Sequence, residues 1–383
     1  MNIASDIILE EKTAIGSFDF PTNPMTAVDA IDQILASAAH MRASDIHCDP
    51  RKEDTIVRFR IDGRIGEVGT IHKRLHDEVI ARLKILSGAR TDIHALPQDG
   101  RWRNVLNGCE YNIRISFMPT YHGENAVIRL LPSKTSADTS FAKLGFTPDH
   151  VHLIDKAMKN THGLILVTGP TGSGKTTTLH TCLSLKVREP LSIVTLEDPI
   201  EYEIPGVRQV HVRHSHGVTF GSGLRAALRQ DPDVIMVGEI RDNETAKVAV
   251  HTALTGHLVL STLHTNSALE AIPRLVDMGV DHYLLASTLR LIIAQRLVRT
   301  MCHECFAEGC DRCGNSGYHG RIVIAEVCEV DTLLRDHISM KSSSSVLEDI
   351  ARSNGFCPII EDGIEKVDWG ITTRTEVMSI LNI

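Results

Sequence analysis

A glycine-rich segment of eight residues constrains the fold of this chain more than any other feature. It runs from Gly169 to Thr176, reads GPTGSGKT, and follows directly on the run LILVT at 164–168. The pattern G-x-x-x-x-G-K-[ST] between a strand-like run and a helical stretch predicts a phosphate-binding loop, because its glycines let backbone N–H groups point inward at phosphate oxygens. The alternative is a glycine-rich turn without a ligand, and the complete motif with both flanks argues against it.

The motif assigns separate tasks to its residues. We expect Lys175 to reach the β- and γ-phosphates and the Thr176 hydroxyl to bind Mg²⁺, while the next helix offers its positive end to the phosphates. A nucleoside triphosphate with Mg²⁺ is therefore the expected ligand. The nucleotide-binding residues predicted by the motif are Gly169, Pro170, Thr171, Gly172, Ser173, Gly174, Lys175 and Thr176.

Short apolar runs alternate with helical stretches throughout the second part of the chain. Apolar runs of this length and β-branched character are typical of buried strands in a parallel sheet flanked by helices. The sequence therefore predicts an α/β domain over residues 143–383, with a C-terminal helical part. The runs are 164–167, 193–196, 234–237 and 258–260.

The first part of the chain predicts a separate, small α+β domain over residues 26–132. Apolar residues recur at helical spacing behind the possible cap Thr26, which predicts a helix that ends before Ser44. Alternating segments at 56–61, 111–116 and 126–130 predict strands.

The boundaries of this small domain follow from composition. Residues 133–142 lie in a polar, turn-rich stretch and are the predicted interdomain linker. Residues 1–25 contain two prolines and no hydrophobic period, so we expect a disordered lead-in there.

Carboxylates follow two of the predicted buried strands. Glu239 ends the strand at 234–237, and Glu197 and Asp198 end the strand at 193–196. Because the carboxyl ends of parallel strands converge on the ligand, these acids are candidates for the base that activates water and for a partner of Mg²⁺. The alternative for each acid is a solvated side chain that caps a loop.

Two histidines flank another apolar strand. His257 precedes the run 258–260 and His264 follows it, within the segment TGHLVLSTLHT. A histidine near a γ-phosphate can detect that group through a hydrogen bond. The chain contains 20 histidines, so an ordinary structural role is the alternative for both.

Two C-x-x-C pairs lie within twelve residues and predict a metal site. They are Cys302 with Cys305 and Cys310 with Cys313. Four thiolates suit Zn²⁺ in a closed, structural site, so we expect a zinc knuckle over 302–313. Only four residues separate the pairs, and His303 could replace one thiolate. A redox pair is a further alternative, although nothing resembling a thioredoxin context surrounds the motif.

Five arginines lie on or near the predicted strands of the first domain without a matching number of acids. One interpretation is solvated surface charge. Another is that some of them reach a nucleotide held by the other domain or by a neighbouring subunit and neutralise charge in the transition state. The residues alone do not separate these interpretations. The five are Arg58, Arg60, Arg64, Arg114 and Arg129.

Overall composition excludes several classes of protein. The formal net charge is −8, from 40 basic and 48 acidic residues, which argues against a stable nucleic-acid partner. No apolar stretch reaches the ~18 residues that a membrane span requires. The amino terminus lacks the basic start and apolar block of a secretion signal, so we expect a cytoplasmic protein. Cysteines in that reducing compartment favour metal binding over disulfides.

Together these segments resemble the secretion ATPase superfamily of the GspE/PilB type, the motors of type II secretion and type IV pilus assembly. The resemblance runs from about residue 43 to the carboxyl terminus. The strings that carry it are ASDIH at 43–47, RFRIDG at 58–63, LPQDGR at 96–101, the phosphate loop, EDPIEY at 197–202, GLRAALRQDPDVIMVGEIRD at 223–242 and TGHLVLSTLHT at 255–265.

The resemblance implies roles for individual residues. Glu197 would be the acid near Mg²⁺, and Glu239 would be the Walker B glutamate that acts on the attacking water. His257 and His264 would be the His-box pair. Arg114 and Arg129 match the first-domain arginines that contact nucleotide when the domains close.

The resemblance also implies an architecture and partners. It implies a PAS-like first domain, a RecA-like ATPase domain, and a homo-hexamer. ATP hydrolysis in that ring would drive an inner-membrane platform protein, which places the motor peripherally at the inner membrane. The four cysteines favour an assembly motor over a retraction motor.

Two departures from the family pattern affect this interpretation. The insert between the cysteine pairs is shorter than usual, and only about 25 residues precede the first predicted helix. A compact pilus or competence-type motor therefore fits better than a full secretion motor. Two alternatives for the function are a nucleotide-binding scaffold that switches a membrane complex without significant turnover and a DNA-transfer motor, which the charge balance disfavours.

Overall fold

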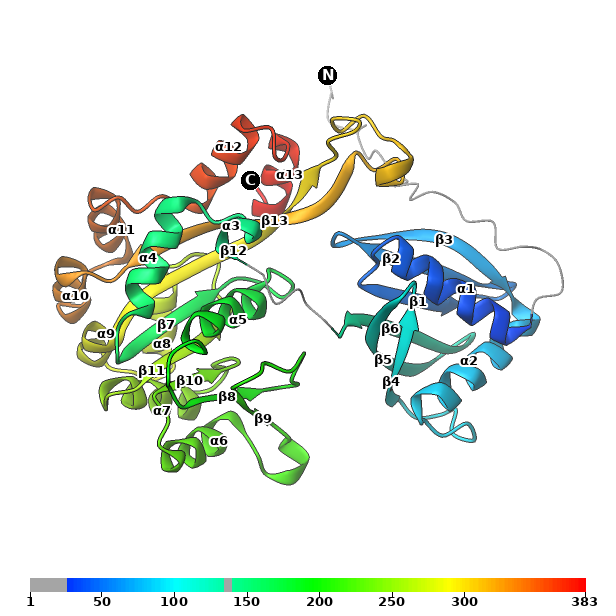
Figure 1. Ribbon diagram of the computed structural model, residues 1–383, viewed down its shortest axis with the longest axis horizontal. Coiled ribbons are helices and arrows are strands. Elements are labelled where there is room, and N and C mark those ends of the chain that lie inside the picture. The colour runs from blue at the N-terminus through cyan, green and yellow to red at the C-terminus, as the bar shows by residue number, and fades with distance from the viewer. Residues whose placement is uncertain (1–25, 134–139) are drawn as a thin grey trace, which may run out of the picture. The chain divides into compact units, whose positions relative to one another are not determined.

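The structure is a computed structural model that describes residues 26–133 and 140–383 (Figure 1). It divides into two compact units. Of the described residues, the first comprises 26–133 with 301–320, and the second comprises 140–300 with 321–383. The expected lead-in, 1–25, lies outside the described residues, and so does most of the expected linker.

The first unit is built on a six-stranded sheet with the order β3-β2-β1-β6-β5-β4. All five ladders between its strands are antiparallel. This α+β arrangement agrees with the expectation for the first part of the chain, whereas its PAS-like character stays a prediction. The strands are β1 Asp45–Pro50, β2 Asp54–Ile61, β3 Arg64–His72, β4 Gln98–Leu106, β5 Cys109–Thr120 and β6 Gly123–Pro132.

Two helices, α1 (Ala27–His40) and α2 (Lys73–Ser87), share one hydrophobic core with this sheet. Ile46 of β1 lies opposite Phe59 on one neighbouring strand and Ile128 on the other, and all three side chains are buried in that core. Because successive strand residues point to opposite faces, the residues next to these three form the other face of the sheet. That face carries charged side chains.

The start of α1 is set by a capping box at Thr26. The Thr26 hydroxyl accepts a hydrogen bond from Asp29 N at 3.2 Å, and the Asp29 carboxylate accepts one from Thr26 N at 3.2 Å. Two donors of the first turn are thereby satisfied. The helix ends at His40, in agreement with the predicted end before Ser44.

The second unit is built on a seven-stranded sheet with the order β13-β12-β7-β11-β10-β8-β9. Its ladders from β12 through to β9 are all parallel. The predicted parallel sheet is therefore confirmed, and each of the four apolar runs forms a strand. The strands are β7 Gly163–Thr168, β8 Ile193–Glu197, β9 Arg208–His211, β10 Val234–Val237, β11 Leu258–Leu263, β12 Leu289–Met301 and β13 Tyr318–Glu329.

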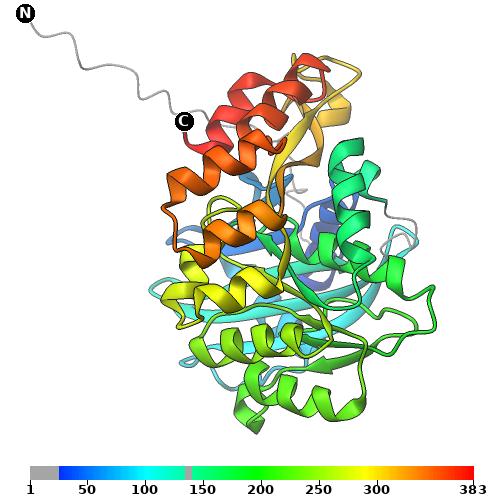
Figure 2. The same cartoon turned by 90° about the vertical axis from the view of Figure 1, so that its left-hand side faces the viewer.

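Helices cover both faces of this sheet. Leu164 and Leu166 of β7 belong to one hydrophobic cluster, and Ile165 and Val167 belong to another on the opposite face. The first cluster joins the sheet to α6 Phe220–Ala227, α7 Asn243–Leu254, α8 Ala271–Asp277, α9 His282–Thr288, α10 Thr332–Ser339 and α11 Ser344–Ser353, which Figure 2 shows. The second cluster joins it to α3 Phe141–Leu144, α4 Pro148–Met158 and α5 Lys175–Lys186.

The carboxyl terminus adds a smaller cluster. Val298 of β12 and Ile324 of β13 pack with Val377 and with the helices α12 (Ile359–Asp368) and α13 (Arg374–Leu381). Short 3₁₀ turns occupy His214–His216, Leu228–Gln230 and Asp311–Cys313. Over residues 26–133 and 140–383, none of the helices has the length and apolar character that crossing a bilayer requires.

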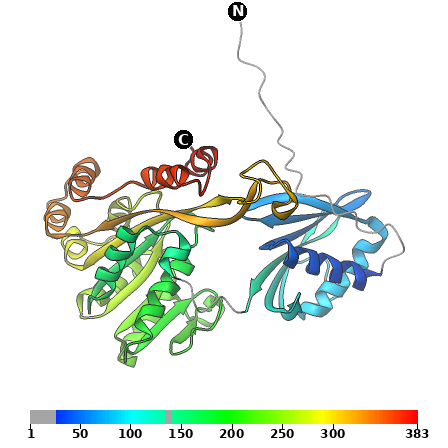
Figure 3. The same cartoon turned by 45° about the horizontal axis from the view of Figure 1, so that its top comes forward.

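The two longest strands of the second unit carry the cysteine segment. β12 has 13 residues and β13 has 12, against six in β7, so both run on beyond the central strands (Figure 3). The segment between them, Met301–Gly320, groups with the first unit, and Gly320 N donates a hydrogen bond to Asp62 Oδ2 at 2.9 Å. The sequence had placed this segment with the ATPase domain.

Candidate nucleotide site

The glycine-rich segment forms a loop between β7 and α5. Its three glycines have positive φ: 142° at Gly169, 80° at Gly172 and 87° at Gly174. Side chains rarely tolerate these backbone angles, so the loop requires glycine at these points. α5 starts at Lys175 from Gly174, which has no side chain to cap it. The N–H groups of the first turn are therefore suited to an anion.

Lys175 is folded back onto this loop. Its Nζ donates hydrogen bonds to the carbonyl oxygens of Gly169 and Pro170, both at 2.9 Å. Burial lowers the pKa of Lys175 to about 8, Glu239 opposes this shift, and Arg296 adds to it. A phosphate group would supply the negative charge that this buried ammonium lacks.

Glu239 lies just beyond β10 and close to this lysine. Its Oε1 is 2.6 Å from Arg241 Nη2, and its Oε2 is 3.7 Å from His264 Nε2. The Glu239 side chain is only 13% exposed, whereas that of Arg241 is 65% exposed. His264 lines a cavity together with Gly169 and Pro170, so Glu239, beside His264, lies next to the phosphate loop.

Glu197 is the last residue of β8, and its side chain is buried. Its Oε1 accepts hydrogen bonds from Thr195 Oγ1 at 2.6 Å and from Gln209 Nε2 at 3.0 Å. Its Oε2 lies 3.4 Å from His180 Nε2 without forming a hydrogen bond to it. This oxygen therefore has no hydrogen-bond donor among the described residues. Burial raises the pKa of Glu197, but the contacts from His180, Gln209 and Thr195 outweigh it and hold the pKa below its usual value.

His180 is a neighbour of the site that the sequence analysis did not single out. It lies on α5, one helical turn after Thr176, and therefore on the same side of the helix. Its ring meets that of Tyr202 edge to face, with centroids 4.6 Å apart. The spacing of four residues between Thr176 and His180 could have indicated that both lie on the same side of the helix. The approach of His180 to Glu197 needs the tertiary structure.

The structure separates the two histidines of the segment TGHLVLSTLHT. His264 follows β11 at the edge where the phosphate loop leaves β7, since Leu263 lies opposite Thr168. His257 precedes β11 at the other edge, and its carbonyl oxygen accepts a hydrogen bond from Gly163 N at the start of β7. His257 therefore lies a full strand length from the phosphate loop of its own chain, and its expected role at a γ-phosphate stays a prediction.

The pKa of His264 is lowered by burial and by the nearby charges of Lys175 and Arg241, and Glu239 opposes the shift. A cavity of about 370 Å³ opens beside this histidine and Gly169. Its other lining residues come from α8 and the loop before it, including Glu270 and Arg274. The site thus has open space next to the phosphate loop.

Arg114 and Arg129 belong to the first unit and lie directly opposite each other on β5 and β6. The same register continues to Arg101 on β4, to Asp45 on β1 and to Arg60 on β2. Directly opposite residues of neighbouring strands share a face, so four arginines and one aspartate form a row across the sheet.

Asp45 is the only acid in this row. Its Oδ1 lies 2.8 Å from Arg129 Nε, and its Oδ2 lies 3.6 Å from Arg60 Nε. Burial raises the pKa of Asp45, but hydrogen bonds from Arg129 and Ser44 and both arginine charges outweigh it, so the pKa lies below its usual value. One buried carboxylate thus orients two arginines of the row.

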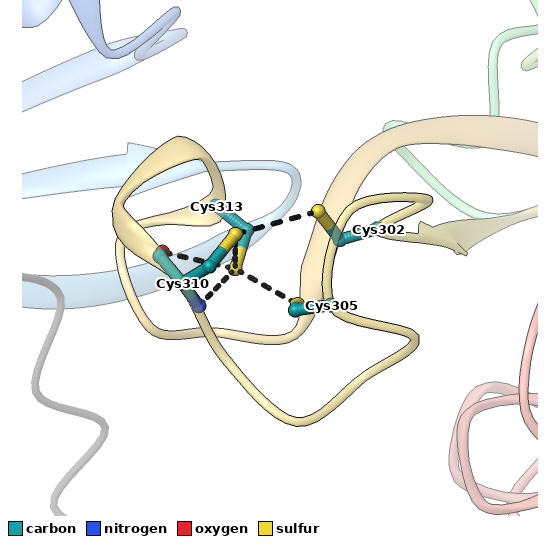
Figure 4. A group of neighbouring side chains, drawn as sticks. All are labelled: Cys302, Cys305, Cys310 and Cys313. Atoms are coloured by element: carbon teal, nitrogen blue, oxygen red, sulfur yellow. Dashed lines mark hydrogen bonds between the residues drawn. The ribbon is translucent and has the colours of Figure 1, made fainter.

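The four cysteines come together as the sequence predicted (Figure 4). Their Sγ atoms all lie within 4.8 Å of one another, and three of the pairs are 3.7–3.8 Å apart. A tetrahedral Zn²⁺ with bonds of about 2.3 Å would require Sγ–Sγ distances of about 3.8 Å, so the cluster fits this ion. His303 is not part of the group found among the described residues, so the four thiols do not need it as a substitute.

Backbone amides support the cysteine cluster. Cys313 Sγ accepts N–H groups from Cys310 at 3.2 Å and from Gly317 at 3.3 Å, and Cys305 Sγ accepts one from Gly309 at 3.2 Å. Such donors stabilise sulfur that carries negative charge. The donor set is therefore suited to thiolates.

The family model for "Type II/IV secretion system protein" matches residues 23–379. The chain belongs to this family. The type II secretion system protein HxcR of Pseudomonas aeruginosa is 43% identical over 358 residues, which cover 91% of this chain and 76% of HxcR. The type IV pilus assembly ATPase PilB of Thermus thermophilus is 41% identical over 376 residues, which cover 91% of this chain and 42% of PilB.

Solved structures of secretion-type ATPases share the fold. The pilus retraction motor PilT, with bound ADP, matches with a TM-score of 0.64 and 27% identity over 91% of this chain and 96% of that chain. The ATPase DotB of Legionella pneumophila matches with a TM-score of 0.73 and 24% identity over 95% of this chain and 98% of that chain. The second unit therefore has the RecA-like fold of this family.

Proposed function

We propose that this member of the type II/IV secretion system family is a Mg²⁺-dependent ATPase that powers assembly of a type IV pilus or a type II secretion pseudopilus. The observation that supports this most directly is the position of Glu239, whose neighbour His264, at 3.7 Å, lines the same cavity as Gly169 and Pro170 of the phosphate loop. A nucleotide-binding scaffold without turnover would need no carboxylate there. The names of the relatives favour secretion and pilus assembly over DNA transfer.

Three residues of the site would have separate roles in ATP hydrolysis. Lys175 would leave the carbonyl oxygens of Gly169 and Pro170 and bind β- and γ-phosphate oxygens. Glu239 would orient the attacking water and accept its proton, a task that suits a partly buried carboxylate. His264, beside Glu239, would contact the γ-phosphate.

Two oxygens of the site suit Mg²⁺. The Thr176 hydroxyl stands at the first turn of α5, and Glu197 Oε2 is buried without a hydrogen-bond donor among the described residues. Hydroxyl and carboxylate oxygens are the ligands that Mg²⁺ prefers beside phosphates. When bound, the ion would neutralise charge that develops on the phosphates.

Arg114 and Arg129 are proposed to supply positive charge to the transition state, from this chain or from a neighbouring copy in a homo-hexamer. The row in which they lie contains four arginines and one aspartate. This excess positive charge suits a triphosphate. The ring is proposed to act on an inner-membrane platform protein, which would hold it peripherally at the membrane from the cytoplasm.

The four cysteines are proposed to bind one structural Zn²⁺. The Sγ–Sγ distances agree with a tetrahedral site, and all four ligand positions come from the protein. A closed site of this kind stabilises local structure and leaves no position for substrate.

The proposal is tested by phosphate release from ATP with and without Mg²⁺. We expect Mg²⁺-dependent release by the unaltered chain and its loss in Lys175→Ala, because the ammonium is needed to hold the phosphates. Lys247→Ala is the matched control, since Lys247 is an exposed lysine on α7. Equal rates in all three proteins would contradict the proposal.

A further inference from the structure

The strand β12 passes directly beneath the phosphate loop. It pairs with β7 in parallel as far as Ala294, which lies opposite Thr168 at the end of β7. There β7 gives way to the loop, whereas β12 continues for seven more residues. The next residue, Gln295, therefore lies beyond the ladder. Its backbone is so close that a Cβ added to Gly169 would lie 2.5 Å from the Gln295 carbonyl oxygen.

The side chain of Gln295 turns toward α5 and not away from it. Strand residues alternate between faces, so Gln295 shares its face with Leu291 and Ile293, which belong to the cluster that packs on α5. Its neighbour Arg296 points the other way, and Arg296 Nη2 donates to the Asn266 carbonyl oxygen at 3.1 Å.

Both ends of the Gln295 amide are used on the loop and its helix. Its Nε2 donates to the Ser173 carbonyl oxygen at 2.8 Å, and its Oε1 accepts from Thr178 Oγ1 at 2.8 Å. Gln295 and Thr178 are fully buried. Ser173 precedes Lys175 and Thr178 follows Thr176, so one amide holds the chain on both sides of the two residues that the motif assigns to phosphate and Mg²⁺.

We propose that Gln295 is a positioning residue that holds the phosphate loop in its nucleotide-binding shape before the nucleotide arrives. A loop already fixed in this shape loses less conformational freedom on binding, so affinity is higher than for a mobile loop. Gln295 touches neither phosphate nor metal and acts only through Ser173 and Thr178. This inference rests on the proposed nucleotide-binding function.

Two variants test the proposal. Gln295→Met keeps the length of the side chain and removes both hydrogen bonds, and Thr178→Val removes one of them. Thr288→Val is the matched control, because the Thr288 hydroxyl is equally buried and donates to the Leu284 carbonyl oxygen at 2.6 Å on α9. For each protein the measurements are hydrogen exchange of amides 169–178 without ligand, Kd for ATP and ADP, turnover at saturating ATP, and Tm.

We expect faster exchange in the loop of Gln295→Met and a Kd for ATP raised by about tenfold, with turnover at saturation reduced by less than about threefold. Thr178→Val should shift the same quantities in the same direction by less. Thr288→Val should lower Tm and leave both loop exchange and Kd unchanged. If Gln295→Met acted only through a general loss of stability, Thr288→Val would change exchange and Kd as well.

Three results would overturn the proposal. One is a Gln295→Met protein with unchanged loop exchange, and another is one with unchanged Kd. The third is a Thr288→Val protein with the same rise in Kd as Gln295→Met. Failure of the unaltered chain to bind ATP would instead contradict the proposed function, and the exchange comparison without ligand would still show whether Gln295 holds the loop.

Discussion

Lys175 Nζ lies 2.9 Å from the carbonyl oxygen of Gly169, so the lysine expected to bind phosphate is hydrogen-bonded to the first residue of its own loop. This carbonyl and that of Pro170 carry only partial negative charge, so they stabilise the ammonium less than an anion would. The pKa of Lys175, lowered by burial to about 8, reflects that environment.

ATP binding should therefore be linked to proton uptake by Lys175. Above a pKa of about 8 the ligand-free lysine is mostly neutral, and bound phosphate raises its pKa and restores the proton. Affinity should fall by about tenfold per pH unit above this pKa. Calorimetry in buffers of different ionisation enthalpy should show close to one proton taken up at about pH 9 and almost none at about pH 6.5. Uptake that does not change with pH would contradict this.

Arg129→Ala should slow ATP hydrolysis by on the order of 10³ and weaken ATP binding by less than about threefold, because an arginine finger acts mainly in the transition state. Steady-state turnover and equilibrium binding measure the two effects. Asp45→Asn is the control, since it removes the ion-pair partner at 2.8 Å and keeps the arginine. Equal losses of binding and turnover in Arg129→Ala would show that the assignment is wrong.

The purified chain should contain one zinc ion, and Cys310→Ser should lose it. Because metal binding in a short segment is local folding free energy, removal of zinc should increase proteolysis within 301–320 and change ATP affinity by less than about twofold. Elemental analysis and limited proteolysis measure these outcomes. Cys109→Ser is the control, since Cys109 is exposed and lies outside the cluster. A chain purified without zinc would refute the site.

Glu376→Ala should reduce the free energy of unfolding by about 3–5 kcal/mol, because it removes the carboxylate that forms an ion pair with the buried Arg299. Glu376 Oε2 lies 2.7 Å from Arg299 Nη2, with side-chain exposures of 2% and 10%, and this pair joins α13 to β12. Glu348→Ala breaks an exposed pair with Arg352 and should cost less than about 0.5 kcal/mol. Denaturant unfolding of both variants measures the difference, and similar losses would contradict the account.

The features that could be predicted from the sequence are those encoded by local pattern. The loop 169–176 and the strand-end acids Glu197 and Glu239 each belong to a short sequence motif that predicts their chemistry without tertiary information. The order and direction of the strands then decide which strand ends lie next to the loop. In the segment 255–265 they put His264 beside the loop and His257 at the opposite edge of the sheet.

Other features depend on register between distant segments. The hydrogen bond from Gln295 to Ser173 joins residues 122 positions apart. The sequence does not tell that Gln295 lies one residue past the point where β12 stops pairing with β7. The row through Arg114 and Arg129 likewise depends on the pairing of β5 with β6, which neither strand specifies by itself.

ATP hydrolysis at this site is tested most sharply by ATP binding and single-turnover phosphate release of Glu239→Gln. This variant should bind Mg·ATP with nearly unchanged affinity and release phosphate at least about 100-fold more slowly, since the amide cannot accept the proton of the attacking water. Release at the rate of the unaltered chain would contradict the assignment of Glu239 and, with it, hydrolysis at this site.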